Sequence, residues 1–155
     1  MPLTLMLVFR ESTEPLTRES IEDARRLWRS SGLQDYDLQL EVRTAGGTVS
    51  LYDVSVRDGD VVRLRLDGLP TESRRPGDFS VPGLFETLER EAELAAEPNG
   101  PFSATGAQAI MRVRFDEETG HLERYLRSVT GSRETMEIRT VSFDPVTRKQ
   151  SGLPG

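Results

Sequence analysis

The dipeptide Asp58-Gly59 lies between two stretches of alternating apolar and polar residues, 49–57 and 61–67, and it constrains the fold most. A type I′ turn needs positive φ at both central residues, and Asp-Gly accepts that conformation readily. The pattern therefore predicts an antiparallel hairpin. Its inward-facing side chains are expected to be Tyr52, Val54, Val56, Val62, Leu64 and Leu66.

The same alternation predicts further strands, and helical spacing predicts two helices. The strands are expected at 3–9, 36–43, 111–115, 121–129 and 134–143. In the last of these, Met136 and Ile138 share a face that Phe143 does not, and a bulge near Arg139 would restore the register. Gly120 is expected to supply the left-handed position of the 116–120 turn.

The first helix is expected within residues 18–31, with its apolar face formed by Ile21, Ala24, Leu27 and Trp28. Ser20 with Asp23 has the spacing of a capping box, and Thr17 is an alternative cap one turn earlier. Gly32 is expected to end this helix. The second helix is expected at 81–97, with Leu84, Phe85, Leu88, Ala92 and Ala95 on its apolar stripe.

These elements predict an α+β fold with two helices packed on an antiparallel sheet of six or seven strands, in the order β-(αβββ)-(αβββ). The 155 residues suit one domain over 1–150, with a pseudo-repeat of 17–67 and 82–143 and a frayed tail at 151–155. The repeat is one of pattern, because the two halves share no convincing residue identities.

Composition excludes several functions. A formal net charge of -6 disfavours nucleic acid and anionic lipid, and the absence of cysteine excludes disulfides, thiol nucleophiles and cysteine-based zinc sites. No stretch approaches the ~20 apolar residues of a membrane span. Residues 3–9 lack the basic and small-residue flanks of a secretory signal, so a cytoplasmic location is expected.

Candidate catalytic and metal-ligating residues are few. The single histidine, His121, follows a turn and is interpreted as a surface residue, although Glu123, Tyr125 and Arg127 could join it on one strand face. The acid pairs Glu22-Asp23 and Glu89 with Glu93, like the acids of 116–118, fall on helix surfaces or in a turn. We therefore expect no catalytic residue, no metal site and no cofactor.

Arginines alternate along several strands and are the candidate binding residues. Together with His121 they are Arg63, Arg65, Arg112, Arg114, Arg124 and Arg127. Acidic residues alternate with them, which is typical of a solvated sheet face with cross-strand ion pairs. The functional hypothesis is a face that binds an acidic protein or ligand.

Four motifs, in this order and spacing, resemble an uncharacterised bacterial family of small, often secreted or lipid-anchored proteins. They are ARRLW-x4-L-x-DYDL, V-x-VRDGDVV, PGLFETL and FDEETGHL-x-RY, with matching positions Trp28, Tyr36, Gly59, Leu84, Phe85, Asp116, Gly120 and Tyr125. This chain lacks the cysteine pair and the signal peptide that many members carry. The resemblance implies no activity.

Three classes of function remain. The residues favour a non-enzymatic binding or interaction domain that uses the charged outer face or an edge of the sheet. A carrier of a small molecule or lipid would need a cavity between helix and sheet. A hydrolase would need converging carboxylates with shifted pKa values, or a role for His121.

Overall fold

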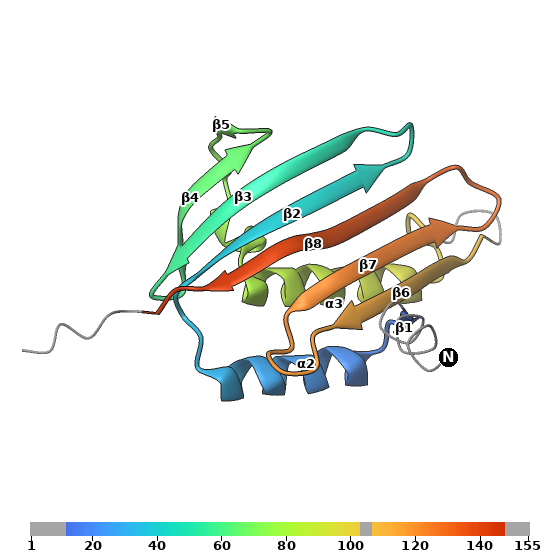
Figure 1. Ribbon diagram of the computed structural model, residues 1–155. Helices are drawn as coiled ribbons and strands as arrows, with labels where there is room; N and C mark the ends of the chain where they lie inside the picture. Colours follow the sequence, from blue (N-terminus) through green and yellow to red (C-terminus); the bar gives the residue numbers. More distant parts are fainter. Residues whose placement is uncertain (1–11, 103–106, 148–155) are drawn as a thin grey trace, which may run out of the picture.

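A computed structural model describes residues 12–102 and 107–147 and shows one α+β unit with two helices and one antiparallel sheet of eight strands (Figure 1). The helices are α2 (Arg18–Ser31) and α3 (Val81–Ala96), and Pro76–Phe79 forms a short 3-10 turn, η1. The strands are β1 (Glu14–Pro15), β2 (Tyr36–Thr44), β3 (Val49–Arg57), β4 (Asp60–Leu66), β5 (Leu69–Pro70), β6 (Ala109–Phe115), β7 (Leu122–Val129) and β8 (Thr135–Pro145).

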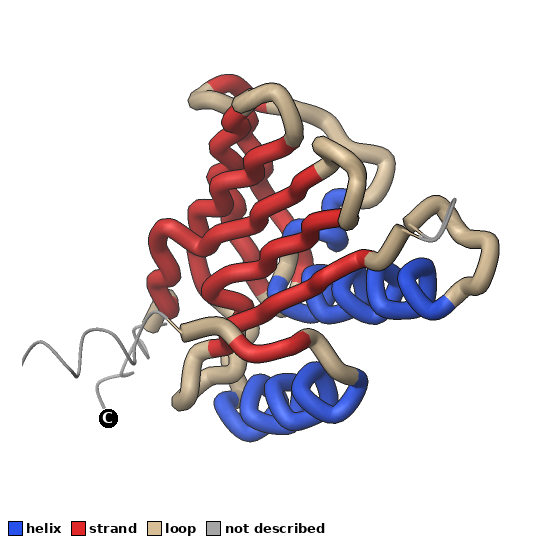
Figure 2. The backbone as a smooth tube through the Cα atoms, turned by 90° about the vertical axis from the view of Figure 1, so that its right-hand side faces the viewer, coloured by secondary structure: helices blue, strands red, loops and turns tan. Residues whose placement is uncertain are grey.

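Each helix precedes a three-stranded antiparallel meander, β2–β3–β4 after α2 and β6–β7–β8 after α3. The spatial order is β1-β6-β7-β8-β2-β3-β4-β5, so the pairing of β8 with β2 joins the two meanders into one sheet. Figures 1 and 2 show both helices on the same side of this curved sheet. The other side, here called the outer face, carries no helix of the described residues.

The helix boundaries follow local chemistry. The hydroxyl of Thr17 accepts the N–H of Ser20, and the side chain of Ser20 in turn accepts the N–H of Thr17. The N-cap is therefore Thr17, and the expectation that Ser20 caps the helix was wrong. Gly32 ends α2 with φ 65°, as predicted, and Ser80 caps α3 by accepting the N–H of Gly83.

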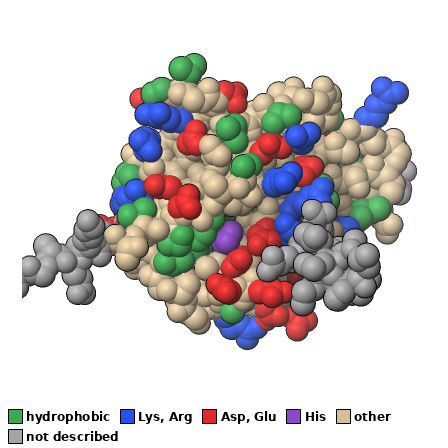
Figure 3. All heavy atoms as spheres, viewed as in Figure 1, with side chains coloured by type: hydrophobic (Ala, Val, Ile, Leu, Met, Phe, Trp, Pro, Cys, Tyr) green, Lys and Arg blue, Asp and Glu red, His purple; other side chains and the backbone are tan. Residues whose placement is uncertain are grey.

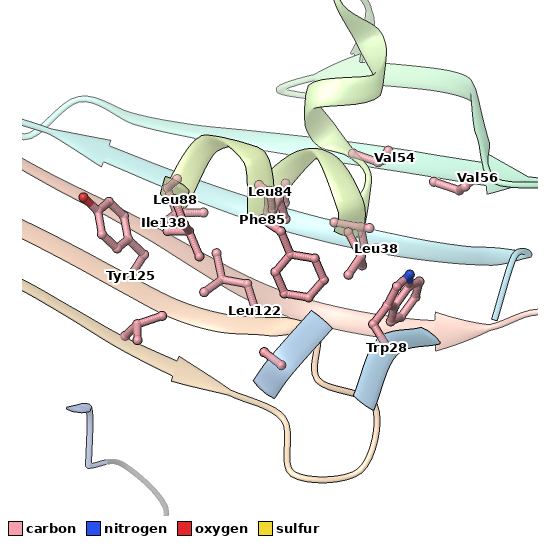
Figure 4. Close-up of a cluster of buried hydrophobic side chains, with 14 of the residues drawn as sticks. Trp28, Leu38, Val54, Val56, Leu84, Phe85, Leu88, Leu122, Tyr125 and Ile138 are labelled. Carbon is pink, nitrogen blue, oxygen red and sulfur yellow. The ribbon is translucent and has the colours of Figure 1, made fainter. Parts of the chain in front are cut away.

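The core lies between the helices and the inner face of the sheet (Figure 4). Trp28 packs edge-on to Tyr36, with ring centroids 5.2 Å apart, so its predicted role as a core residue is confirmed. The hydroxyl of Tyr36 accepts the N–H of Val81 at 2.9 Å and ties β2 to the start of α3. Figure 4 shows Leu84, Phe85 and Leu88 of α3 directed at the sheet.

Three bulges change which face the following residues occupy. At the β3–β4 hairpin, Val56 pairs with Val61 and Ser55 with Arg63, so Val62 is the extra residue and is 61% exposed. Its predicted inward position was wrong. In β8, Val141 is the extra residue between Thr140 and Ser142, which confirms a bulge near Arg139 and lets Phe143 pack on the core. The third bulge, at Glu123, shapes the site described below.

The predicted antiparallel α+β architecture is confirmed, but the expected six or seven strands are eight. Two of them, β1 and β5, contain only two residues each and lie outside the stretches predicted to be strands. The predicted strand at 3–9 and the predicted frayed tail at 151–155 lie outside the described residues. Neither described helix is long and apolar enough to cross a membrane.

Candidate functional site

A polar hollow of about 470 Å³ lies where the turn between β6 and β7 meets the end of β8. Its lining includes Asp116, Thr119, His121, Glu123 and Phe143. Figure 3 shows the purple histidine, the only one in the chain, between hydrophobic side chains and a group of red carboxylates. The hollow therefore combines an imidazole with several acids.

The 116–120 turn positions these groups. The carboxylate of Asp116 accepts hydrogen bonds from the backbone N–H groups of Glu118 and Thr119 at 3.0 and 2.8 Å. The Asp116 side chain therefore stabilises the turn that it begins. Gly120 has φ 79°, and a Cβ at this position would collide with the carbonyl of Ala24 in α2. The turn is therefore packed against helix α2 and held in place.

His121 is buried, with 8% of its surface exposed, so its interpretation as a surface residue was wrong. Its ring stacks on Phe143 with centroids 4.1 Å apart. This contact depends on the bulge at Val141, which brings Phe143 to the inner side of β8. The predicted bulge near Arg139 turns Phe143 inward, but the sequence did not indicate that the Phe143 ring would stack on His121.

A hydrogen-bond chain determines which nitrogen of His121 carries the proton. The hydroxyl of Thr119 lies 2.5 Å from His121 Nδ1 and 3.0 Å from Asp116 Oδ2. An ionised carboxylate can only accept, so the Thr119 hydroxyl donates to Asp116 and Nδ1–H donates to Thr119. The neutral ring then keeps an unprotonated Nε2, which makes no hydrogen bond with the described residues.

The environments of the two acids shift their pKa values in opposite directions. Burial opposes ionisation of Asp116, but the hydrogen bonds from Thr119 and Glu118 outweigh it and lower the pKa of Asp116. Burial raises the pKa of Glu123, and the charge of Asp116 adds to this effect, while Arg114 at 2.6 Å opposes it. Burial also lowers the pKa of His121, which favours the neutral ring, against the charge of Asp116.

Asp116, His121 and Glu123 each offer one ligand atom for a metal, and these atoms lie within 4.8 Å of one another. The prediction of no metal site assumed that the acids are scattered over surfaces and turns. For these residues the assumption was wrong, because the turn and the bulge at Glu123 gather two carboxylates around a buried imidazole.

A second polar cluster, here called the brace, lies on the inner face of β7 and contains Glu91, Tyr125 and Arg127. The Tyr125 hydroxyl donates to Glu91 at 2.9 Å, and Arg127 forms an ion pair with the same carboxylate. Arg127 also lies over the Phe102 ring, 4.4 Å from its centroid. The grouping of His121, Glu123, Tyr125 and Arg127 that the sequence left open does not form, because the bulge at Glu123 separates the first two residues from the last two.

The candidate arginines do not form one patch. Arg63 and Arg65 lie on β4, and Arg112 and Arg114 lie on β6, with β7, β8, β2 and β3 between them. Five inter-strand spacings of about 4.8 Å place the two pairs roughly 24 Å apart along the sheet. Arg127 belongs to the brace on the opposite face, so it cannot act with them.

One group of arginines is brought together on the outer face. Arg114 pairs in register with Arg124, and Arg124 with Arg139, so three arginines stand side by side on β6, β7 and β8. We call them the arginine row. Arg114 forms an ion pair with Glu123, and Arg124 forms one with Glu137 at 3.1 Å. Within the described residues, Arg139 has no ion pair.

A second hollow, of about 400 Å³, lies at the opposite end of β7 and β8, near the β2–β3 turn, and is lined by Gly46, Leu126, Arg133 and Met136 among others. Neither hollow lies between a helix and the sheet, where Leu84, Phe85 and Leu88 fill the interface with buried side chains. A carrier cavity at that interface is therefore not favoured.

No protein-family model matches this chain, and a search of the curated proteins finds no significant match. The resemblance to a bacterial family stays a prediction, and the function has to be argued from the site itself.

Proposed function

We propose that this chain is a non-enzymatic binding domain that recognises an acidic partner through the outer face of strands β6, β7 and β8. The arginine row carries the proposal. Like charges directly opposite one another on neighbouring strands destabilise a sheet, by roughly 0.2–1 kcal/mol per pair. Glu123 and Glu137 offset this repulsion for two of the three arginines, whereas Arg139, which lies opposite Glu41 of β2, forms no ion pair with the described residues.

The surroundings of the row support recognition of an acidic group. Glu123 and Glu137 hold two of the guanidinium groups in place, while exposed Arg139 keeps its donors available. A planar guanidinium binds a carboxylate with two parallel hydrogen bonds. The net charge of -6 makes a protein or small ligand a better partner than nucleic acid.

The face is a better candidate than the edges of the sheet. The two-residue strands β1 and β5 cover part of each edge, and short terminal strands limit pairing with another chain. Arg112 is also tethered, because its guanidinium donates to the hydroxyl and carbonyl oxygens of Thr13.

The test is a binding titration with a fluorescent glutamate-rich peptide at low and physiological salt. We expect the double variant Arg124→Ser, Arg139→Ser to bind about tenfold more weakly, which equals about 1.4 kcal/mol. The matched control, Arg63→Ser with Arg65→Ser, removes the same charge from β4 and is expected to bind normally. Equal losses in both variants, or binding indifferent to salt, would contradict the proposal.

A second candidate function, a hydrolase, is favoured by one observation: Asp116 and Glu123 converge while their pKa values move apart. Such a pair can divide the roles of base and acid. Its test is a screen for hydrolysis of esters, phosphoesters and glycosides. An activity that Glu123→Gln abolishes, with the fold intact, would support this candidate over the binding domain.

A further inference from the structure

The search for a ligand site beyond the arginine row leads to the hollow at the start of β7. Two carboxylates and one imidazole converge there. Asp116 belongs to the 116–120 turn, His121 follows that turn, and Glu123 is the bulge residue of β7. We propose that Asp116, His121 and Glu123 bind a divalent transition-metal cation such as Zn²⁺.

The first argument is the state of His121. His121 is 8% exposed, and its Nε2 makes no hydrogen bond with the described residues. This nitrogen is not among the buried atoms that lack a partner, so it is open to the hollow that His121 lines. An unprotonated imidazole nitrogen that is open to a hollow is available as a metal ligand.

The second argument is the support of the ring. Metal-binding histidines usually donate their other N–H to a carboxylate or another acceptor, which fixes the tautomer and the ring orientation. Here Nδ1–H donates to the Thr119 hydroxyl, and that hydroxyl donates to Asp116. Stacking on Phe143 holds the ring in the same plane.

The third argument is charge. Two half-buried carboxylates repel one another, and burial increases the cost because less water screens them. Arg114 compensates for Glu123 at 2.6 Å, but within the described residues Asp116 has no ion pair. A dication held between the two acids would neutralise both charges.

The ligand set indicates the kind of metal. One nitrogen with carboxylate oxygens suits Zn²⁺ and its neighbours in the first transition row, whereas Ca²⁺ and Mg²⁺ prefer oxygen ligands alone. Three protein ligands leave a position for water or for a partner group. The two proposals share Glu123, which also pairs with Arg114 of the arginine row, but their tests stay separate because Arg124 and Arg139, the residues changed in the binding test, are not ligands.

The test is calorimetric titration of the full chain with ZnCl₂ in a non-chelating buffer. We expect one Zn²⁺ per chain, at least tenfold weaker binding for Glu123→Gln, and unchanged binding for the matched control Glu118→Gln. Glu118 lines the same hollow but is not one of the three ligands. Circular dichroism checks that both variants fold.

Three results would overturn the proposal: no uptake at one equivalent, equal weakening by Glu118→Gln and Glu123→Gln, or Ca²⁺ binding as tight as Zn²⁺. The second result would show a diffuse acidic surface rather than a site. The third would show that the imidazole is not a ligand.

Discussion

Strand β7 carries a polar cluster toward each of its ends, and the two clusters are built in opposite ways. Toward its C-terminal end, the brace sets one carboxylate, Glu91, against one guanidinium and one hydroxyl. At its N-terminal end, the hollow sets two carboxylates, Asp116 and Glu123, around a neutral imidazole. The first cluster is balanced in charge, whereas the second has an excess of acid.

This difference separates a structural role from a binding role. Arg127 and Glu91 are each only 14% exposed and their charges balance, so the brace has little capacity for another ion, although the buried Nε of Arg127 has no hydrogen-bond partner among the described residues. The hollow keeps a pair of converging acids, of which Asp116 has no ion pair among the described residues, beside an imidazole whose Nε2 makes no hydrogen bond with them. Like charges that a fold brings together without neutralising both are charges that a bound cation can neutralise.

The largest expected effect compares the turns at the two ends of β7. Gly120 and Gly131 both have positive φ, 79° and 74°, but only Gly120 lies against another element. Gly131→Ala should lower the free energy of unfolding by about 1 kcal/mol, the cost of the left-handed conformation. Gly120→Ala should cost about 4 kcal/mol, because the new methyl group also collides with Ala24 of α2. Urea melts of both variants measure the difference, and equal losses would show that the 116–120 turn does not pack on α2.

The next comparison removes one negative charge from each cluster. Glu91→Gln should lower the free energy of unfolding by about 3 kcal/mol, because it leaves Arg127 buried without its counter-charge. Glu123→Gln should change the free energy of unfolding by less than about 0.5 kcal/mol. The lost attraction to Arg114 is offset because the repulsion between the carboxylates of Glu123 and Asp116 is lost as well. Thermal and urea unfolding at pH 7 test this. If Glu123→Gln proves the more destabilising variant, the hollow rather than the brace is the structural cluster.

A smaller effect distinguishes the brace by its response to alkali. Burial, together with the charge of Glu91, raises the pKa of Tyr125, so the folded chain keeps this proton at a pH where the unfolded chain loses it. Stability is therefore expected to fall as pH rises above about 10, by ~1.4 kcal/mol per pH unit for each such tyrosine.

Tyr125→Phe should remove one of these contributions and cost about 1.5 kcal/mol at neutral pH through the lost hydrogen bond to Glu91. Tyr36, whose pKa burial raises to about 12, keeps its own contribution in this variant. Unfolding curves between pH 9 and about 11 supply the measurement. An unchanged slope in Tyr125→Phe would mean that the Tyr125 proton is not held by the fold.

Much of the fold could be predicted because local signals and global packing agree. Asp58-Gly59 turns with φ 53° and 82°, as the type I′ pattern requires, and the alternation in residues 36–42 places Tyr36, Leu38 and Leu40 in the core. The errors arise where a bulge adds one residue and reverses the alternation. At Val62 and Glu123 the inserted residue is visible only in the pairing with the neighbouring strand, which the sequence does not reveal.

The candidate site was the harder part for the same reason. His121, Asp116 and the 116–120 turn could be identified from the sequence, but the burial of the histidine depends on Phe143, some twenty residues away on β8. The arginines could be identified as outward residues, whereas the arginine row depends on the order of β6, β7 and β8 in space. Thr119 carried no signal beyond its place in the turn, because a threonine there is ordinary turn chemistry.

The most direct test of the difference between the two clusters uses the fact that the chain contains one histidine. Proton NMR therefore shows a single pair of imidazole ring signals, all from His121. With Zn²⁺ added in steps, we expect these signals to move to a new position that is complete at one equivalent, while the ring signals of Tyr125 in the brace stay in place. Imidazole signals that remain unmoved beyond one equivalent would contradict the assignment of the hollow as a cation site.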